Sequence, residues 1–416
     1  MYENVLYQKA TRFLKEAVQK DNLPGSILFS GPEGSGKFTT ALETARVLSC
    51  QQNPKGRWEC KCQSCLRHKA MISPNVLIAG SGNRILEISA ARRTLLQESI
   101  NNSSHLESSR YLYIRAVRKL TSRFNSILWE DDEKLQKISL LVQQIEELIE
   151  VLDPVHPLVE HSEIEKTVDQ VQTLCEKLEN SFLYESLPVN QVRNISSWAH
   201  LSTVNGKKIV IFENADKMAE TSRNALLKIL EEPPQNVVFI LTTSNRGAIL
   251  PTILSRVRTY TFTERSSSEQ EELIERVYHT KPKLSKNEKN FNINDFLLSY
   301  LPVSPDLVRF KADEFFEKIA QGRLCDLQSI CEQCGNFTPR VLFKIFMQEL
   351  FQAQKYLLKS EGGCEASAKI LREIQRIYNN TSVFNQSPRA ALEELTRSIM
   401  QINYQNKGIL RDAMNE

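Results

Sequence analysis

The sequence contains no apolar run close to the roughly 20 residues that a membrane-spanning helix needs. Residues 1–19 also lack the continuous apolar core of a signal peptide and are instead typical of an amphipathic helix. We therefore expect a cytoplasmic protein that makes no membrane contact. No internal repeat is evident along the 416 residues, which argues against a solenoid or a repeat array.

A strong excess of one charge is also lacking. The chain has 53 basic and 50 acidic residues, and its net charge is +3. Such a charge does not by itself predict nucleic-acid binding, because phosphate contacts need local clusters of basic residues. Apolar residues make up 41% and charged residues 25% of the chain, as in globular proteins. The length favours two or three domains.

Short apolar runs alternate with helical segments in the first part of the chain. Residues 26–30 form such a run, which precedes a glycine-rich turn and a helix expected from Thr39 to Ser49. Further buried strands are expected at 75–79, 208–212 and 237–241. This order of strand, loop and helix is typical of α/β nucleotide-binding domains.

The rest of the chain has the periodicity of helices. Between about 95 and 183, apolar residues recur three and four positions apart, which predicts a helical hairpin or a three-helix bundle whose stripes form a core. Residues 265–292 are polar and favour a helix followed by a linker. From about 293 to the end, the spacing of Leu, Ile and Phe again predicts helices.

A candidate phosphate-binding loop follows the first predicted strand. The segment Gly-Pro-Glu-Gly-Ser-Gly-Lys-Phe at 31–38 matches G-x-x-x-x-G-K-[ST] up to its last position. The glycines would turn backbone N–H groups toward phosphate oxygens, and Lys37 would reach the terminal phosphates. The last position should carry a hydroxyl for Mg²⁺ but is Phe38, and Thr39 lies about 100° further round the helix. The alternative is a glycine-rich turn with a lysine unrelated to phosphate.

A second segment, 209–216, stands where a Walker B strand would end in Asp-Glu. In that motif the Asp orders Mg²⁺ and the Glu polarises the attacking water. Glu213 could partly replace the Asp, although it is one methylene longer. Asn214 cannot act as a general base, because a neutral amide has no useful proton affinity near neutral pH. ATP hydrolysis is therefore not expected here, while binding of ATP or ADP stays open. The candidate nucleotide-binding residues are Gly31, Gly34, Ser35, Gly36, Lys37, Phe38, Thr39 and Glu213.

Two more motifs carry a family resemblance. Residues 224–234 are similar to the N-A-L-L-K-x-L-E-E-P stretch of bacterial clamp-loader subunits, and residues 250–257 resemble their Ser-Arg-Cys motif, with Val257 in place of Cys. Residues 212–218 also resemble the degenerate Walker B segment of delta-prime subunits. The chain thus resembles the delta-prime subunits of DNA polymerase III clamp loaders, AAA+ proteins related to the gamma/tau subunit, over about 1–95 and 184–263.

The resemblance implies a fold and a domain order. We expect an α/β AAA+ domain at 1–263, with a parallel sheet flanked by helices and a helical insertion at about 95–183. A helical lid would follow at 264–325, and an all-α collar for oligomerisation at 326–416. Thr242, Thr243 and Asn245 are candidate sensor residues, and Arg309 is a candidate lid arginine.

Cysteine is unevenly distributed. Three of the nine cysteines fall at 60, 62 and 65, and such a cluster favours a metal in a reducing compartment. The resemblance adds Cys50 and implies that Cys50, Cys60, Cys62 and Cys65 hold a structural Zn²⁺, although the Cys60-x-Cys62 spacing is one residue shorter than the family pattern. The alternative is four free thiols. Cys331 and Cys334, with Cys325 nearby, are expected to be buried thiols.

The resemblance further implies that Arg256 projects into the ATP site of a neighbouring subunit as an arginine finger. The alternative is a surface arginine that follows a helix. The predicted function is that of a non-hydrolysing stator subunit. Its partners would be the gamma/tau and delta subunits and, through the complex, the sliding clamp and primer-template DNA. One alternative is an ATP-hydrolysing gamma/tau-type motor subunit. Another is a nucleic-acid-binding scaffold that uses the basic run Arg115, Arg118, Lys119 and Arg123, a run that is more often a solvated helix face.

Overall fold

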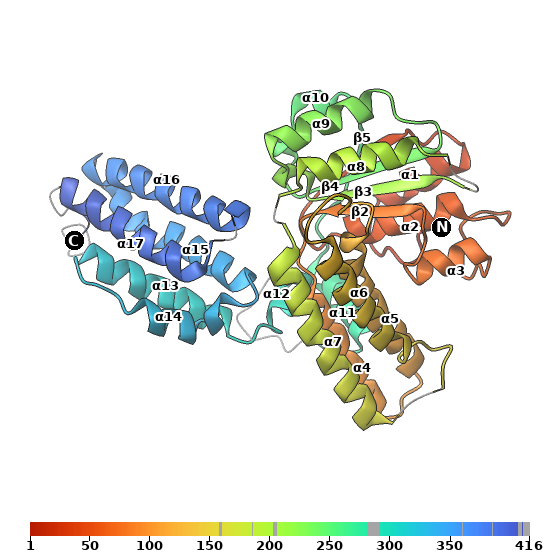
Figure 1. Ribbon diagram of the computed structural model, residues 1–416, viewed down its shortest axis with the longest axis horizontal. Helices are drawn as coiled ribbons and strands as arrows, with labels where there is room; N and C mark the ends of the chain where they lie inside the picture. Colours follow the sequence, from red (N-terminus) through yellow and green to blue (C-terminus); the bar gives the residue numbers. More distant parts are fainter. Residues whose placement is uncertain are drawn as a thin grey trace. The chain divides into compact units, whose positions relative to one another are not determined.

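A computed structural model describes residues 1–157, 160–184, 186–202, 206–281, 291–359, 361–384, 386–406 and 410 (Figure 1). The chain divides into two compact units, Met1–Leu297 and Leu298–Glu416. In the described part of the chain, no helix is both long enough and apolar enough to cross a membrane.

A five-stranded parallel sheet organises the first unit. Its strands are β1 (Ser26–Ser30), β2 (Val76–Gly80), β3 (Lys208–Glu213), β4 (Val237–Thr243) and β5 (Arg258–Thr261). They lie in the order β2-β3-β4-β1-β5, so β1 pairs with both β4 and β5. The first four strands lie where the apolar runs predict them. β5 was not predicted, because only one of its four residues, Tyr260, is buried.

Helices cover both faces of this sheet (Figure 1). On one face, α1 (Ala10–Gln19) and α2 (Lys37–Ser49) pack on alternate strand residues such as Ile27 and Ile211. On the other, α8 (Val189–His200) and α9 (Glu220–Glu231) pack on Leu28, Val210 and Phe212. The alternation arises because successive strand side chains point to opposite faces. The helix expected over residues 1–19 is shorter than that segment, since it begins at Ala10.

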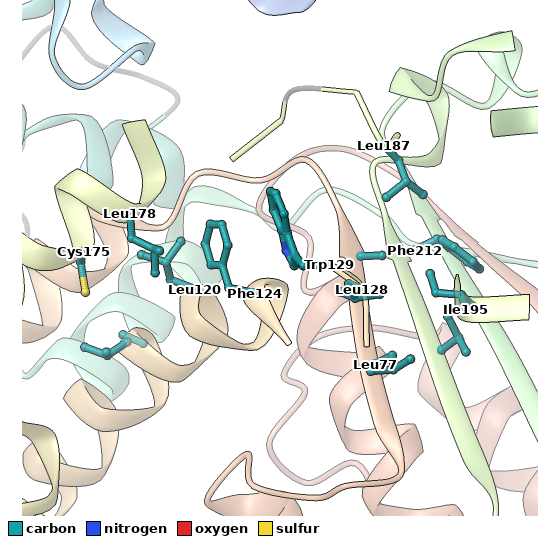
Figure 2. Close-up of a cluster of buried hydrophobic side chains, with 14 of the residues drawn as sticks. Leu77, Leu120, Phe124, Leu128, Trp129, Cys175, Leu178, Leu187, Ile195 and Phe212 are labelled. Atoms are coloured by element: carbon teal, nitrogen blue, oxygen red, sulfur yellow. The ribbon is translucent and has the colours of Figure 1, made fainter. Parts of the chain in front are cut away.

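The predicted bundle is present and has one more helix than expected. It consists of α4 (Ile85–Ile100), α5 (Leu106–Thr121), α6 (Leu135–Glu150) and α7 (His161–Phe182), with α4 packed on α5 and α7. Its apolar stripes are core, and that core is continuous with the sheet. Figure 2 shows the junction: Leu120 and Leu178 lie on the bundle side, Phe212 and Ile195 on the sheet side, and the ring of Trp129 lies between them.

Three short helices complete the first unit. They are α3 (Gln63–Lys69), α10 (Pro251–Leu254) and α11 (Ser267–Tyr278). α11 begins with a capping box, in which Ser266 and Glu269 each bond to the other's backbone N–H. The linker predicted to follow α11 falls mostly on 282–290, outside the described residues. A further helix, α12 (Ile293–Leu298), spans the junction between the two units.

The second unit is helical, as the sequence predicts. It contains α13 (Pro305–Ala320), α14 (Leu327–Gln333), α15 (Val341–Ala353), α16 (Glu361–Phe384) and α17 (Pro388–Gln405). Ser304 and Ser387 cap the helices that begin with Pro305 and Pro388. One core runs from Val308 to Leu410. The division into a lid at 264–325 and a collar at 326–416 stays a prediction.

Candidate functional site

The glycine-rich loop connects β1 to α2 as the motif requires. Gly34 and Gly36 have φ values of +71° and +92°, which residues with a Cβ rarely adopt. Lys37 is the first residue of α2 and is buried. Its Nζ donates to the carbonyl oxygens of Gly31 at 2.6 Å and Pro32 at 2.5 Å. Burial lowers the pKa of Lys37 to about 8, although Glu33 and Asp216 act in the opposite direction. The Lys37 ammonium group therefore binds two carbonyl oxygens of its own loop.

A second cation lies on the outside of the same loop. Arg265, between β5 and α11, is buried and donates to the Gly34 carbonyl at 2.7 Å. It also donates to the Leu6 carbonyl, and a Cβ added at Gly36 would lie 2.9 Å from its Nη2. The loop is thus packed against residues from the N-terminal segment and from the segment after the sheet.

Glu213, at the end of β3, is bound by two guanidinium groups. Nη2 of Arg84 lies 2.7 Å from each of its carboxylate oxygens. Nη2 of Arg123 forms an ion pair with the same carboxylate. Arg84 immediately precedes α4, and Arg123 follows α5. Both oxygens of the acid that could replace the Walker B Asp are therefore paired with protein cations.

Phe38 contacts the same arginine. The Cζ of Arg84 lies 4.5 Å from the centre of the Phe38 ring, a cation–π distance. Phe38 occupies the position at which the phosphate-loop motif has its Mg²⁺-binding hydroxyl. Thr39, the neighbouring hydroxyl, is half-buried in α2. One guanidinium thus touches both the altered phosphate-loop residue and the altered Walker B residue.

Two glycines allow the chain to pass close to Glu213. Gly80 has φ +108°, and a Cβ there would lie 2.1 Å from the Glu213 carbonyl oxygen. A Cβ at Gly82 would lie 2.9 Å from both the Glu213 carboxylate and Arg123. A side chain at Gly80, the last residue of β2, would therefore clash with the backbone, and one at Gly82 would displace the side chains of Glu213 and Arg123.

Further acids tie the bundle to this site. Glu87 of α4 forms ion pairs with Arg84 at 3.5 Å and with Lys119. Glu179 of α7 accepts the Arg84 backbone N–H at 2.6 Å. Burial raises the pKa of Glu179 to about 7, although the Arg84 N–H and the charge of Arg123 oppose the rise.

The basic run of α5 faces inward, which corrects its expected exposure. Arg115 donates to the Lys69 carbonyl, and Arg118 forms an ion pair with Glu146 at 3.0 Å. Lys119 and Arg123 pair with Glu87 and Glu213, as described above. The four residues are neither a solvated face nor a phosphate-binding surface. They join the bundle to the sheet and to α3.

The predicted sensor residues lie beside the Walker B segment. Asn214 has a left-handed backbone and donates its N–H to Thr242 Oγ1 at 3.2 Å. Its side-chain amide donates to the Ser81 carbonyl. Thr243 Oγ1 donates to Asp216 at 2.6 Å and accepts the Asn245 N–H. The amide that stands in place of a catalytic Glu is thus used in a structural contact.

Arg256 follows α10 and has a side chain that is 31% exposed. Its Nη2 lies 2.8 Å from Glu231 at the end of α9, and its Nη1 donates to the Thr252 carbonyl at 2.6 Å. These contacts hold the guanidinium at the surface. Arg309 belongs to the second unit, where it pairs with Asp306 at 2.8 Å.

The four N-terminal cysteines come together. The Sγ atoms of Cys50, Cys60, Cys62 and Cys65 all lie within 4.8 Å of one another, and those of Cys50 and Cys60 are 3.7 Å apart. A tetrahedral site with Zn–S bonds of about 2.3 Å has sulfur atoms roughly 3.8 Å apart. The four thiols therefore could hold a metal ion of this size, and the short Cys60-x-Cys62 spacing does not prevent their approach. Arg46, buried in α2, donates to Cys65 Sγ at 3.2 Å.

Burial raises the pKa of Cys65. Burial also acts to raise the pKa of Cys62, but hydrogen bonds from the backbone N–H groups of Gln51 and Cys65 and from the thiols of Cys60 and Cys65 together lower it to about 6. Cys331 and Cys334 are buried in the second unit, as expected, and burial raises the pKa of both thiols.

Comparison with known proteins identifies the family. The model of the family described as "DNA polymerase III, delta subunit" matches residues 7–152 and 156–266, more than half of the chain. The chain belongs to this family. The match includes most of the bundle, so its status as an insertion stays a prediction.

Relatives of this DNA polymerase III delta-family chain include two delta-prime subunits. That of Haemophilus influenzae is 38% identical over 77 residues, 18% of this chain and 24% of the relative. That of Bacillus subtilis is 29% identical over 155 residues, 36% of this chain and 45% of the relative. The chain therefore spans less than half the length of these curated relatives. The gamma/tau subunit of Mycobacterium bovis is 36% identical over 75 residues, 18% of this chain and 13% of the relative. A gamma subunit-related protein of Thermotoga maritima, a solved structure, has 18% identity and a TM-score of 0.25, with 57% of this chain and 90% of that chain covered.

Sequence reasoning about this family member missed Arg84, Arg265 and Glu179. Each lies far along the chain from the motif that it contacts, so the spacing of residues gives no signal. The glycines at 80 and 82 are the one local sign that the chain passes a crowded site there.

Proposed function

We propose that this chain is a delta-prime-type stator subunit of the bacterial replicative clamp loader. In this role it joins gamma/tau and delta subunits and helps load the sliding clamp onto primed DNA without hydrolysing ATP. The observation that carries the proposal is the pairing of Glu213 with Arg84 and Arg123. A carboxylate held in this way is not free to organise a metal and a water for phosphoryl transfer.

Asn214 supports the same conclusion. Its side chain is neutral and already donates to the Ser81 carbonyl. The position that needs a base to polarise water therefore holds a structural amide. Binding of ATP or ADP at the loop from Gly31 to Lys37 is a separate question. It would require Lys37 to exchange two carbonyl contacts for phosphate oxygens.

The proposed role of Arg256 is to act on the ATP site of a neighbouring subunit. Its side chain is partly exposed, and its guanidinium donates to the Thr252 carbonyl and to Glu231. The pair with Glu231 is at the surface and contributes at most about 1 kcal/mol to stability, so the guanidinium can exchange it for a phosphate.

The cysteine cluster is proposed to hold a structural zinc ion. Cys50, Cys60, Cys62 and Cys65 would supply four thiolates, a ligand set that leaves no open position for catalysis. The ion would fix the loop after α2 to the start of α3.

The proposal is tested by the ATPase rate of the purified full chain, alone and mixed with the motor and delta subunits of its own loader. We expect no turnover by the chain alone. We expect Arg256→Ala to lower the ATPase rate of the complex, because loss of an arginine finger slows hydrolysis at the one ATP site that it contacts by about 10³-fold or more. Neighbouring sites keep their own arginines, so the total rate should fall only in part.

Arg12→Ala is the matched control, because it removes an exposed arginine of the first unit that pairs with Glu16 of its own helix α1 and has no proposed role at an ATP site. Turnover by the chain alone that is lost in Lys37→Ala would identify a motor subunit instead. Equal rates for the wild-type complex and Arg256→Ala would reject the role in trans. DNA binding by the chain alone would favour the scaffold function, although the α5 basic run no longer supports it.

A further inference from the structure

The residues at this site do not fit the Mg²⁺ that phosphate-loop ATPases bind. In those proteins the metal is held between the hydroxyl after the loop lysine and the carboxylate that ends the Walker B strand. The corresponding residues here are Phe38 and Glu213. Mg²⁺ requires near-octahedral oxygen ligands, but Phe38 offers an aromatic face and both Glu213 oxygens face guanidinium nitrogens.

We propose that the guanidinium of Arg84 takes the place of the divalent cation, and that this chain does not bind Mg²⁺ at its nucleotide site. Arg84 lies between the Phe38 ring, 4.5 Å away, and the Glu213 carboxylate, 2.7 Å away. A planar guanidinium suits both neighbours, because it stacks on aromatic rings and binds carboxylates strongly. Phe38 and Arg84 are thus matched: the aromatic ring replaces the metal-binding hydroxyl, and the arginine replaces the metal.

Surrounding residues hold Arg84 in this position. Its backbone N–H is bound by Glu179 at 2.6 Å, and its Nη1 lies 3.5 Å from Glu87. Arg123 contributes a second positive charge at Glu213. A divalent cation would have to approach two guanidinium groups and compete with both for one carboxylate. Because Arg84 and Arg123 flank bundle helices, the inference also makes the bundle part of the nucleotide site.

The test is Mn²⁺ binding, measured by electron paramagnetic resonance on the full chain with and without ADP. We expect the wild type to leave the free Mn²⁺ signal at the level of a protein-free solution that contains the same concentration of ADP. The double variant Phe38→Thr/Arg84→Ala restores a hydroxyl and removes the internal cation, and should bind Mn²⁺. Adding Glu213→Gln should abolish that binding. Thiolates are poor ligands for Mn²⁺, so the cysteine cluster does not interfere.

Two results would overturn the inference. One is wild-type Mn²⁺ binding that Glu213→Gln removes; the other is a folded double variant, checked by circular dichroism, that gains no Mn²⁺. If the double variant does not fold, Phe38→Thr/Arg84→Gln takes its place, and the comparison of wild type with Glu213→Gln still decides the first result. The inference rests on the proposed stator function, but an experiment can contradict either of the two without contradicting the other. A chain that binds Mn²⁺ could still lack ATPase activity, and one that binds none could still prove inactive in trans.

Discussion

Individual residues around Glu213 give the glycine-rich loop of this chain an unusual set of neighbours. The loop glycines and Lys37 of the motif are kept, but three cations of this site are engaged by other groups of the protein. Lys37 bonds to loop carbonyls, and Arg84 and Arg123 pair with Glu213. The resulting charge network is largely buried, so its members should show pH and packing effects that surface charges do not.

Glu179 should make stability depend on pH. Its pKa is raised by burial from 4.5 to about 7 in the folded chain. The folded state therefore binds more protons than the unfolded state between these values, and the associated stability is lost as pH rises through this window. We expect Glu179→Gln, which keeps an acceptor for the Arg84 N–H, to flatten the change of Tm between pH 5 and pH 7. An unchanged slope in the variant would contradict this assignment.

Gly80 should not tolerate even a methyl group. A Cβ there would meet the Glu213 carbonyl oxygen at 2.1 Å, and φ is +108°. Left-handed backbone alone costs about 1–3 kcal/mol for a residue with a side chain, and the clash adds to it. Gly322→Ala is the control, since its φ is +76° and its Cβ would meet nothing within 4 Å. Urea unfolding should show a clearly larger loss of stability for Gly80→Ala, and equal losses would refute the role of close packing.

At the scale of elements, the sequence predicts the features that depend on residues close together along the chain. β1, the glycine-rich loop and α2 follow directly from residues 26–49, and the apolar periodicity predicts the bundle. The inward position of the α5 basic residues could not be predicted, because their partners, such as Glu146 and the Lys69 carbonyl, come from other elements. The role of Phe38 could likewise be predicted only in part. Its sequence position shows that a hydroxyl is missing, but the arginine that covers it is distant in sequence.

The α2–α3 segment should depend on its metal. We expect one zinc per chain by elemental analysis, and a lower Tm after removal with a chelator, because an ion that binds the folded state alone stabilises it. Cys62→Ser should reduce the zinc content. Cys364→Ser, which changes an exposed cysteine in the second unit, is the control and should leave it unchanged. Full zinc occupancy in Cys62→Ser would argue against the four-thiolate site.

At the scale of the whole molecule, two units with separate cores share one chain. Ile195 lies in the core of the first unit and Leu395 in that of the second, and both are fully buried. We expect calorimetry to resolve two transitions. Ile195→Ala and Leu395→Ala should each lower one of them, since such truncations cost about 2–5 kcal/mol. A single transition that both variants shift equally would mean that the units unfold together.

A cation that is part of the chain also makes the site independent of the concentration of free metal ions. A bound metal ion has a free concentration, and it leaves when that concentration falls or when ATP sequesters it. Arg84 is part of the chain and lies beside Glu213, so this positive charge is present at any concentration of free metal ions or ATP. In the proposed stator role, the chain would keep this ion pair unchanged while neighbouring subunits exchange their nucleotides.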